Sequence, residues 1–353
     1  MKRVHLNGLL LIDCPASALN NSKDMENKRT DNTSATKYIK TYQGSFPYLS
    51  AQAFRYWLRD SFPEIEKSPI ERTEKSAYTK ADPISYAEDD LFGYMRAEKN
   101  EKNKKDVKNE SDEKKDEKNK TLTRSSPLKV STFVSIVPIK PTADFGVMAR
   151  HEGDPVPYEH EFYRTTLKGL ISLDLSMVGR FYHIAKAGYK NLDEDRVKQA
   201  NEKKLEAYDN EKAYQLSKEE RTRRIKLIIE ALKDITGGAK QSIHYTDVNP
   251  KFVLLGVIKS GNNIFSNVVS SDSYGLPKIN FDALKEVLNV FKDDILSKIY
   301  IGLPQGYLDS QREKLENVFK ENKFDYILNH PKVIMEEFIK DLESSEKQNS
   351  WLE

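Results

Sequence analysis

A short segment from Tyr48 to Asp60 most constrains the fold, because its apolar residues recur with helical period and must be buried against another element. Its expected N-cap is Ser50, whose hydroxyl can accept a hydrogen bond from a free backbone N–H of the first turn. The apolar stripe of this helix consists of Ala51, Phe54, Trp57 and Leu58. A second, polar and aromatic stripe consists of Gln52, Arg55, Tyr56 and Arg59. The second stripe can bind a polyanion while the first anchors the helix; the alternative is a solvated face.

Charge and composition limit the classes of function. The chain has 353 residues, which is enough for about two domains or one elaborated domain. Lys and Arg number 57 against 55 Asp and Glu, so the net charge is only +2, and a nucleic-acid site would need local segregation of charge. The single cysteine, Cys14, excludes an intrachain disulfide and a cysteine-based zinc site. It also suits a reducing cytoplasm.

The chain shows no feature of a membrane protein. The apolar run from Val4 to Ile12 is too short to span a bilayer, and Asp13 ends it. No small-residue cleavage site of a signal peptide follows this run clearly. We therefore expect a cytoplasmic protein with no membrane partner.

The order of the periodic segments predicts the fold class. A strand at Val4–Ile12 precedes the helix described above, and strands at Val130–Ile139 and Tyr163–Leu175 follow it as a hairpin with a long tip. Ser217 and Glu220 have capping-box spacing at the start of an amphipathic helix, and Phe252–Ile258 is a continuous apolar run typical of a buried strand. The order is βαββαβ, which predicts an α+β, ferredoxin-like or RNA-recognition-like core.

Polar insertions separate these elements. Pro15 to Tyr42 is expected to be a long loop, and Pro63 to Asp90 an irregular insertion. Residues 97–120 are Glu, Lys, Asn and Asp in near alternation, so they cannot bury enough apolar surface to fold and are expected to be disordered. A helix is predicted around Leu284 to Ile295, and the charged tail from Asp309 to Leu352 has a helical pattern.

A glycine-rich loop follows the second helix. Gly237 is well placed as the left-handed residue that ends this helix. Gly237 and Gly238 together let successive N–H groups turn toward an anion, and Lys240 adds a positive charge. The alternative is a helix cap followed by an ordinary loop.

The hairpin tip contains Phe145, Met148, Arg150 and His151. An apolar residue there can wedge between bases, and an arginine can contact a phosphate or stack on a base. The alternative is a loop that covers a neighbouring core. His151 and His160 flank the expected turn, and we expect both to be surface residues.

No motif indicates an enzyme, a metal site or a cofactor. The sequence has no nucleophile elbow, P-loop or G-x-G-x-x-G, and its six histidines show no metal-binding spacing. Asp13, Asp24 and Asp31 follow the first strand, but nothing in the sequence pairs them with a base or a set of ligands. We therefore expect a binding protein rather than a catalyst.

Several of these segments, taken in order, resemble a known family. They are the opening strand, Leu49–Arg59, Asp90–Met95, Ser126–Ser131, and Gly237–Gln241 running on to Pro250–Val253. Their order is similar to that of the DevR-type backbone subunit of type I-B CRISPR Cascade complexes, of the RAMP superfamily. The resemblance covers most of residues 1 to 260 and is weakest at 97–120 and in the tail.

The resemblance implies a non-catalytic scaffold that polymerises along CRISPR RNA. Its partners would be CRISPR RNA, target DNA through guide pairing, further copies of itself and other Cascade subunits, with no cofactor. Gln52, Arg55 and Arg59 would face the guide from a palm. Gly237, Gly238, Lys240 and Gln241 would hold its phosphates, and Phe145, Met148 and Arg150 would form a thumb, with Met148 as the candidate wedge.

The same resemblance implies a division of the chain. The palm would comprise residues 1–62 and 217–260, and a central hairpin 128–180 would carry the thumb at about 140–162. Residues 63–127 and 181–216 would be insertions, and 261–353 a C-terminal helical region. Related type III subunits cleave RNA with an acid after the first strand, so an endoribonuclease using Asp13, Asp24 or Asp31 is the alternative function.

Overall fold

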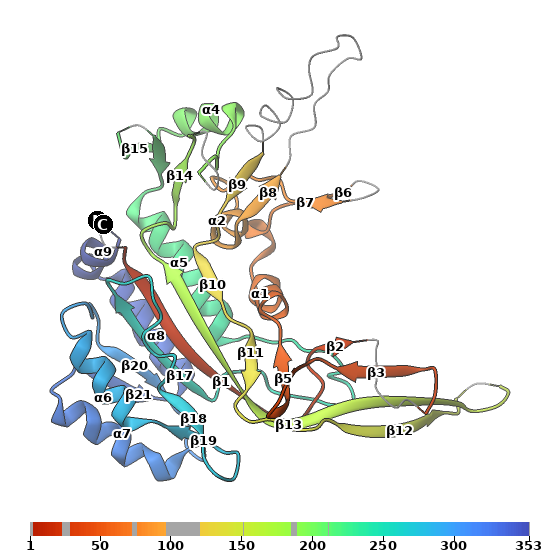
Figure 1. Cartoon of the computed structure of the whole chain (residues 1–353). Helices are drawn as coiled ribbons and strands as arrows, with labels where there is room; N and C mark the ends of the chain where they lie inside the picture. Colours follow the sequence, from red (N-terminus) through yellow and green to blue (C-terminus); the bar gives the residue numbers. More distant parts are fainter. Residues whose placement is uncertain are drawn as a thin grey trace, which may run out of the picture.

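The computed structural model describes residues 3–22, 29–72, 76–96, 121–150, 152–184, 189–210 and 212–352 (Figure 1). The segment 97–120, predicted to be disordered, lies outside the described residues, as do Asp24 and His151. The described part has an elongated α/β body from which one long β-hairpin projects (Figure 1).

The predicted βαββαβ core is present. Its central strand β1 (His5–Ser17) pairs antiparallel with β13 (Val156–Asp174) on one side and with β17 (Phe252–Ile258) on the other. The expected strand at 130–139 is two short strands, β10 (Leu128–Val130) and β11 (Phe133–Ser135), which both pair with β13. With α1 (Ala51–Asp60) and α5 (Lys218–Lys233), these strands confirm the ferredoxin-like fold class.

Side-chain caps start both core helices where the sequence predicts them. Ser50 Oγ accepts a hydrogen bond from the Ala53 N–H at 3.2 Å, and Ser217 Oγ accepts one from the Glu220 N–H at 3.3 Å. The predicted end of α5 is wrong. Asp234 caps this helix by donating its N–H to the Glu230 carbonyl, so the chain has left the helix before it reaches Gly237.

The C-terminal region, expected to be helical, also extends the sheet. Strand β20 (Ile299–Gly302) pairs antiparallel with β17, and β21 (Tyr326–Asn329) runs parallel to β20. Each strand has four residues, too few to show a period, and its partner lies far away in the sequence. The other elements of this region are β18 (Val269–Ser271), β19 (Pro277–Ile279), α6 (Phe281–Val290), α7 (Asp309–Glu321), α8 (Pro331–Glu343) and α9 (Ser345–Trp351).

The expected loop from Pro15 to Tyr42 also contains strands. Strand β3 (Thr33–Thr36) runs parallel to β13 and antiparallel to β2 (Asn21–Ser22), so both support the base of the projecting hairpin. Strand β4 (Tyr38–Thr41) pairs with β5 (Gly44–Leu49), which pairs with β11. The loop prediction is wrong here because the strand partners that order these polar residues are distant in the sequence.

Both faces of the central sheet are covered. Leu6, Leu10 and Ile12 of β1 pack in one core with residues of α1, α5 and α8. Leu9 and Leu11 face the opposite core, which includes residues of α6, α7 and the β18–β19 hairpin. RNA-recognition domains stack bases on an open sheet face. Here that face is occupied by the C-terminal region, so a nucleic acid would have to contact the rim of the sheet and its insertions.

The segment from Pro63 to Asp90, expected to be irregular, is folded where the structure describes it, and so is the rest of the insertion 63–127. It contains η1 (Glu64–Glu66), β6 (Glu71–Arg72), β7 (Ala77–Tyr78), α2 (Ala87–Phe92), β8 (Tyr94–Arg96) and β9 (Leu122–Arg124). All six residues of α2 are buried, three of them acidic. One of these, Asp90, accepts hydrogen bonds from Arg124, Arg224 and the Gly179 N–H, so charge pairing holds the insertion to the core.

The second insertion has a small core of its own, formed by Ile84, Phe181, Leu192, Ala200 and Leu216. Its elements are β14 (Arg180–Tyr182), α4 (Glu194–Glu202), β15 (Glu206–Tyr208) and β16 (Ala213–Gln215). Among the described residues, no helix has the length and apolar character required to cross a membrane.

Candidate nucleic-acid interface

Helix α1 has the two faces that its sequence predicts. Phe54, Trp57 and Leu58 are buried in the core, and Gln52 and Tyr56 are exposed. In Figure 1 the helix lies between two projections that point to the same side of the molecule, the β6–β7 hairpin and the β12–β13 hairpin. Helix α1 therefore has an arm of the molecule on either side.

Arg55 is held by intramolecular contacts. Its guanidinium donates hydrogen bonds to the Leu128 carbonyl at 2.5 Å, the Phe92 carbonyl at 2.8 Å and Ser126 Oγ at 3.2 Å. Burial lowers its pKa, and the neighbouring Arg59 adds to this effect. Arg55 thus ties α1 to the end of α2 and the start of β10, a role that its position on the polar stripe did not suggest.

Arg59 is more open. Its Nε lies 3.5 Å from Glu88 Oε1, its side chain is 38% exposed, and its guanidinium lies 5.7 Å from the centre of the Phe92 ring. Among the described residues, neither terminal nitrogen of Arg59 has a hydrogen-bond partner. Of the two arginines predicted to face a guide, Arg59 is therefore the one whose terminal N–H groups are available to donate hydrogen bonds to a ligand.

The glycine loop packs directly on α1. A Cβ at Gly237 would lie 2.4 Å from the Trp57 ring, so only glycine fits there. Gly238 has φ +107°, a conformation that L side chains rarely adopt. Gln241 closes the loop, because its amide donates to the Gly237 carbonyl at 2.5 Å and accepts from the Thr246 N–H at 2.9 Å.

This loop also contacts the base of the projecting hairpin. The His244 ring lies 4.9 Å from both the His160 ring and the Phe162 ring, measured between centroids. Thr246 and Ser17 hydroxyls are 2.6 Å apart, which joins the loop to the end of β1. The glycine loop, α1 and the hairpin base therefore form one continuous surface. The sequence prediction missed His244 and Tyr158, and it placed His160 at the surface, whereas His160 is 4% exposed.

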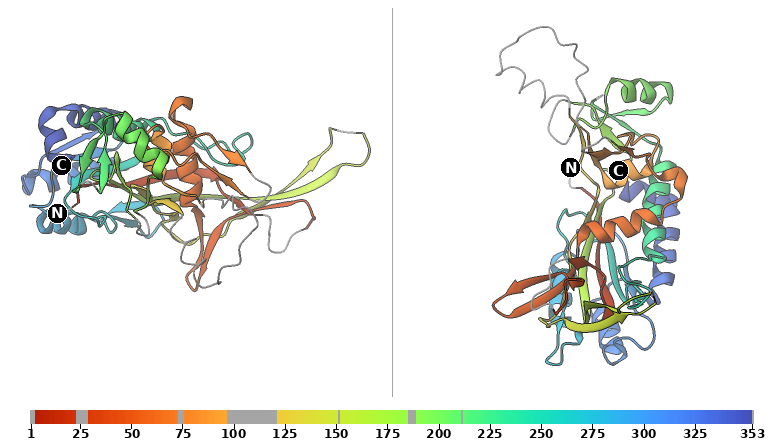
Figure 2. Two further views of the ribbon diagram at one scale, coloured as in Figure 1. Left: turned by 90° about the horizontal axis from the view of Figure 1, so that it is seen from above. Right: turned by 90° about the vertical axis from the view of Figure 1, so that its right-hand side faces the viewer.

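The hairpin itself is formed by β12 (Thr142–Met148) and the first half of β13, with Thr142 opposite Phe162 and Met148 opposite Val156. Seen from above, it extends well beyond the body of the molecule (Figure 2). Phe145 is 48% exposed and Met148 53%, and Arg150 is exposed as well. These side chains belong to no core, in agreement with a protruding tip.

One face of the hairpin carries a row of rings. Tyr158 stacks on His160 at 5.7 Å, and its ring lies where a Cβ of Gly146 would be. Met148 and Val156 continue this face toward the tip, since directly opposite residues of an antiparallel pair share a face. The row from Phe162 to Met148 is called here the thumb stripe.

The residues around His160 and His244 on this surface shift the pKa values of both histidines. Burial lowers the pKa of His160, and Lys240 and His244 lower it further, while Asp144, 3.6 Å from His160 Nε2, opposes the shift. Burial and Lys240 likewise lower the pKa of His244. Burial also lowers the pKa of Lys240. Within the described chain, His160 Nδ1 and His244 Nε2 are buried without a hydrogen-bond partner, so a proton on either atom would have no acceptor.

We therefore expect the protein to lose stability on acidification. The unfolded chain binds more protons at these histidines than the folded chain, so the free energy of unfolding rises with pH. The stabilisation is complete above the unfolded pKa of about 6.5 and is lost as the pH falls through the lower folded values. In urea unfolding across the range from neutral to mildly acidic pH, His160→Phe should show a weaker pH dependence than the wild type. The exposed control His330→Asn should match the wild type; an equal slope in His160→Phe would contradict the assignment.

Of the three acids predicted at the end of the first strand, Asp13 and Asp31 lie in the described part of the chain. Asp13 Oδ1 lies 2.6 Å from Arg164 Nη1, and Asp31 is exposed in the loop before β3. Among the described residues, no three His, Cys, Asp or Glu side chains are grouped so that they could hold a metal ion.

Comparisons with known proteins identify the family. Residues 14–275 match the family described as "CRISPR-associated negative auto-regulator DevR/Csa2". No curated protein matches the sequence. A chain of the solved structure "CRISPR RNA-guided surveillance complex, pre-nicking" is 10% identical with a TM-score of 0.51, and the match covers 95% of this chain and 99% of that one. A chain of a "CRISPR RNA-guided surveillance complex" is 9% identical with a TM-score of 0.49, over 95% and 98% of the two chains.

The similarity to the first of these structures shows a shared fold over nearly the whole length. The family match spans most of the chain and includes α1, the hairpin and the glycine loop. The chain therefore belongs to the CRISPR-associated negative auto-regulator DevR/Csa2 family.

Proposed function

We propose that the protein is a subunit of a CRISPR RNA-guided complex and holds the guide RNA without cleaving it. The observation that carries this proposal is the continuous surface formed by the thumb stripe, the glycine loop and α1, in a chain of this family. In its finer form, the proposal is a type I-B Cascade backbone subunit. Several copies would line one guide RNA and support its pairing with target DNA.

The surface suits a single strand bound without regard to sequence. Rings such as Tyr158 offer stacking platforms that accept any base, and Lys240 and Arg150 offer positive charge for the backbone. Both faces of the central sheet are covered, so the strand would follow the rim from the glycine loop to the thumb stripe. Along this rim, sequence recognition would then come from guide pairing rather than from the protein.

The endoribonuclease alternative has less support. Asp13 is paired with Arg164 on the neighbouring strand β13, which gives this acid a structural role. The direct test is to incubate the protein with guide RNA and a complementary RNA, with and without magnesium, and to follow strand lengths on a denaturing gel. We expect both strands to remain intact, whereas magnesium-dependent fragments that disappear in Asp13→Asn would favour the nuclease.

Removal of two cations should reduce the salt dependence of RNA binding. For a single strand, every cation that neutralises a phosphate contributes about 0.7 to the slope of log K against log salt. We therefore expect Lys240→Gln with Arg150→Gln to bind more weakly and to flatten the slope by about 1.4 in fluorescence anisotropy. The control Lys278→Gln, at the exposed position of β19, should keep the wild-type slope. An unchanged slope in the double variant would place the RNA backbone elsewhere.

A further inference from the structure

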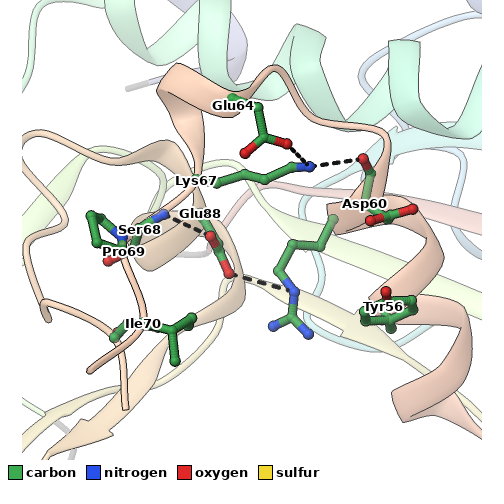
Figure 3. Close-up of a pocket in the computed structure, with 10 residues that line it drawn as sticks. Tyr56, Asp60, Glu64, Lys67, Ser68, Pro69, Ile70 and Glu88 are labelled. Atoms are coloured by element: carbon green, nitrogen blue, oxygen red, sulfur yellow. Dashed lines mark hydrogen bonds and ion pairs between the residues drawn. The ribbon is translucent and has the colours of Figure 1, made fainter. Parts of the chain in front are cut away.

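A pocket of about 540 Å³ lies beside α1, between this helix and the folded insertion. Its lining includes Tyr56, Arg59, Lys67, Ser68, Ile70 and Glu88. Figure 3 shows Tyr56 and Ile70 on opposite sides of the pocket, with Glu88 between them. Tyr56 is 55% exposed and Ile70 54%, so neither side chain is needed by the core. The pocket therefore has two walls on which a flat ring can lie.

The charges of the pocket do not favour a phosphate. Its lining holds the acids Asp60, Glu64 and Glu88 against the cations Arg59 and Lys67. Lys67 is already engaged, because its Nζ donates to Glu64 Oε1 at 2.7 Å and to the Asp60 carbonyl at 3.1 Å. A dianion would thus meet an excess of negative charge, whereas a neutral ring with both donors and acceptors would not.

Two polar side chains lie at the centre of the pocket: Glu88, a hydrogen-bond acceptor, and Arg59, a hydrogen-bond donor. Glu88 is 6% exposed, and it is held by the Ser68 N–H, which donates to Oε2 at 2.7 Å, and by Arg59 Nε near Oε1. A carboxylate has about four acceptor positions, so it can accept further hydrogen bonds. The terminal nitrogens of Arg59, unpartnered among the described residues, can donate at the same place.

We propose that this pocket binds a single nucleobase and selects guanine. Guanine alone among the four bases presents two adjacent donors, N1–H and N2–H, next to an acceptor, O6. Glu88 would accept from the two donors, Arg59 would donate to O6, and Tyr56 would stack on the ring. Uracil offers the carboxylate one donor, and adenine and cytosine place an acceptor beside their amino group.

This inference rests on the proposed function for its source of the base, a nucleotide turned out of a bound RNA strand. Free guanosine, which has no phosphate, presents the same base, so two arms are needed. The first measures anisotropy of a short labelled oligouridine with and without one central guanosine. The second measures binding of the nucleosides guanosine and uridine by isothermal titration calorimetry, which requires no RNA binding.

The wild type should bind the guanosine-containing strand about tenfold more tightly than oligouridine. This is the discrimination expected from one base that is recognised through paired hydrogen bonds. Glu88→Gln keeps an acceptor for the Ser68 N–H and should remove this preference, so that the variant binds the two strands equally. Tyr56→Ala should weaken binding of both strands about tenfold, because the ring on which a base stacks is removed. The control Tyr274→Ala, whose side chain is 88% exposed in the β18–β19 turn, should behave as the wild type.

Equal binding of the two strands by the wild type, or a preference that survives in Glu88→Gln, would overturn the pocket assignment while leaving the proposed function intact. Failure to bind any RNA would overturn the proposed function. In that case, binding of guanosine but not of uridine would still support the pocket, and binding of neither nucleoside would refute it.

Discussion

Replacement of Asp90 by Ala should destabilise the folded protein by about 3–5 kcal/mol, because it leaves two buried guanidinium groups without their shared carboxylate. Arg124 and Arg224 are both buried, and each donates to Asp90; the Gly179 N–H donates to it at 2.9 Å. Arg224 keeps its ion pair with Glu220 at 2.8 Å, whereas Arg124 keeps only neutral acceptors, among them the Arg180 carbonyl. The cost is therefore mainly that of the uncompensated buried charge of Arg124.

Urea unfolding followed by circular dichroism would measure this effect at neutral pH. Asp195→Ala is a matched control, since the Asp195 side chain is 78% exposed and lies in the first turn of α4. We expect the control to remain within about 0.5 kcal/mol of the wild type. A similarly small change in Asp90→Ala would show that the insertion is not held to the core through this carboxylate.

Replacement of Phe145 and Met148 by Ala together should impair assembly on RNA while leaving the fold unchanged. Both side chains are about half exposed on the projecting hairpin, so their removal creates no cavity. If Phe145 stacks on a splayed base, its replacement should cost about 1–3 kcal/mol of RNA affinity, a factor of about 5 to 150. Met148 is flexible enough to fill an irregular gap between bases.

Two measurements on the same preparation separate these outcomes. Thermal melts of the free double variant should coincide with the wild type, and native mass spectrometry on a full-length guide should show fewer copies per RNA. The control Ile39→Ala removes an exposed apolar side chain from β4 and should alter neither result. A variant that melts much earlier but assembles normally would make the hairpin tip part of a core and remove the basis for calling it a thumb.

The sequence predicted the parts of the fold that depend on local pattern. The alternation around β1, the Ser50 and Ser217 caps and the apolar run of β17 each carry their signal within a short stretch of neighbouring residues. Their order was sufficient to give the βαββαβ core.

Features formed by distant partners were not predictable in this way. Strands β3 and β20 are ordered by β13 and β17, from which they are far separated in the sequence. Helical spacing placed Arg55 on a polar stripe, but it could not show that the folded insertion covers that residue. The contact between His160 and His244 likewise joins a strand to a loop that comes much later in the chain.

The central claim is that this protein holds guide RNA, and the RNA recovered with it tests that claim most directly. The tagged protein would be isolated from its host, and its bound RNA sequenced beside that of the variant Lys240→Gln with Arg150→Gln. We predict that the wild type yields short RNAs of uniform length that carry CRISPR repeat sequence, and that the variant yields much less of them. Recovery of RNA that reflects general transcript abundance, or of no RNA at all, would contradict the account.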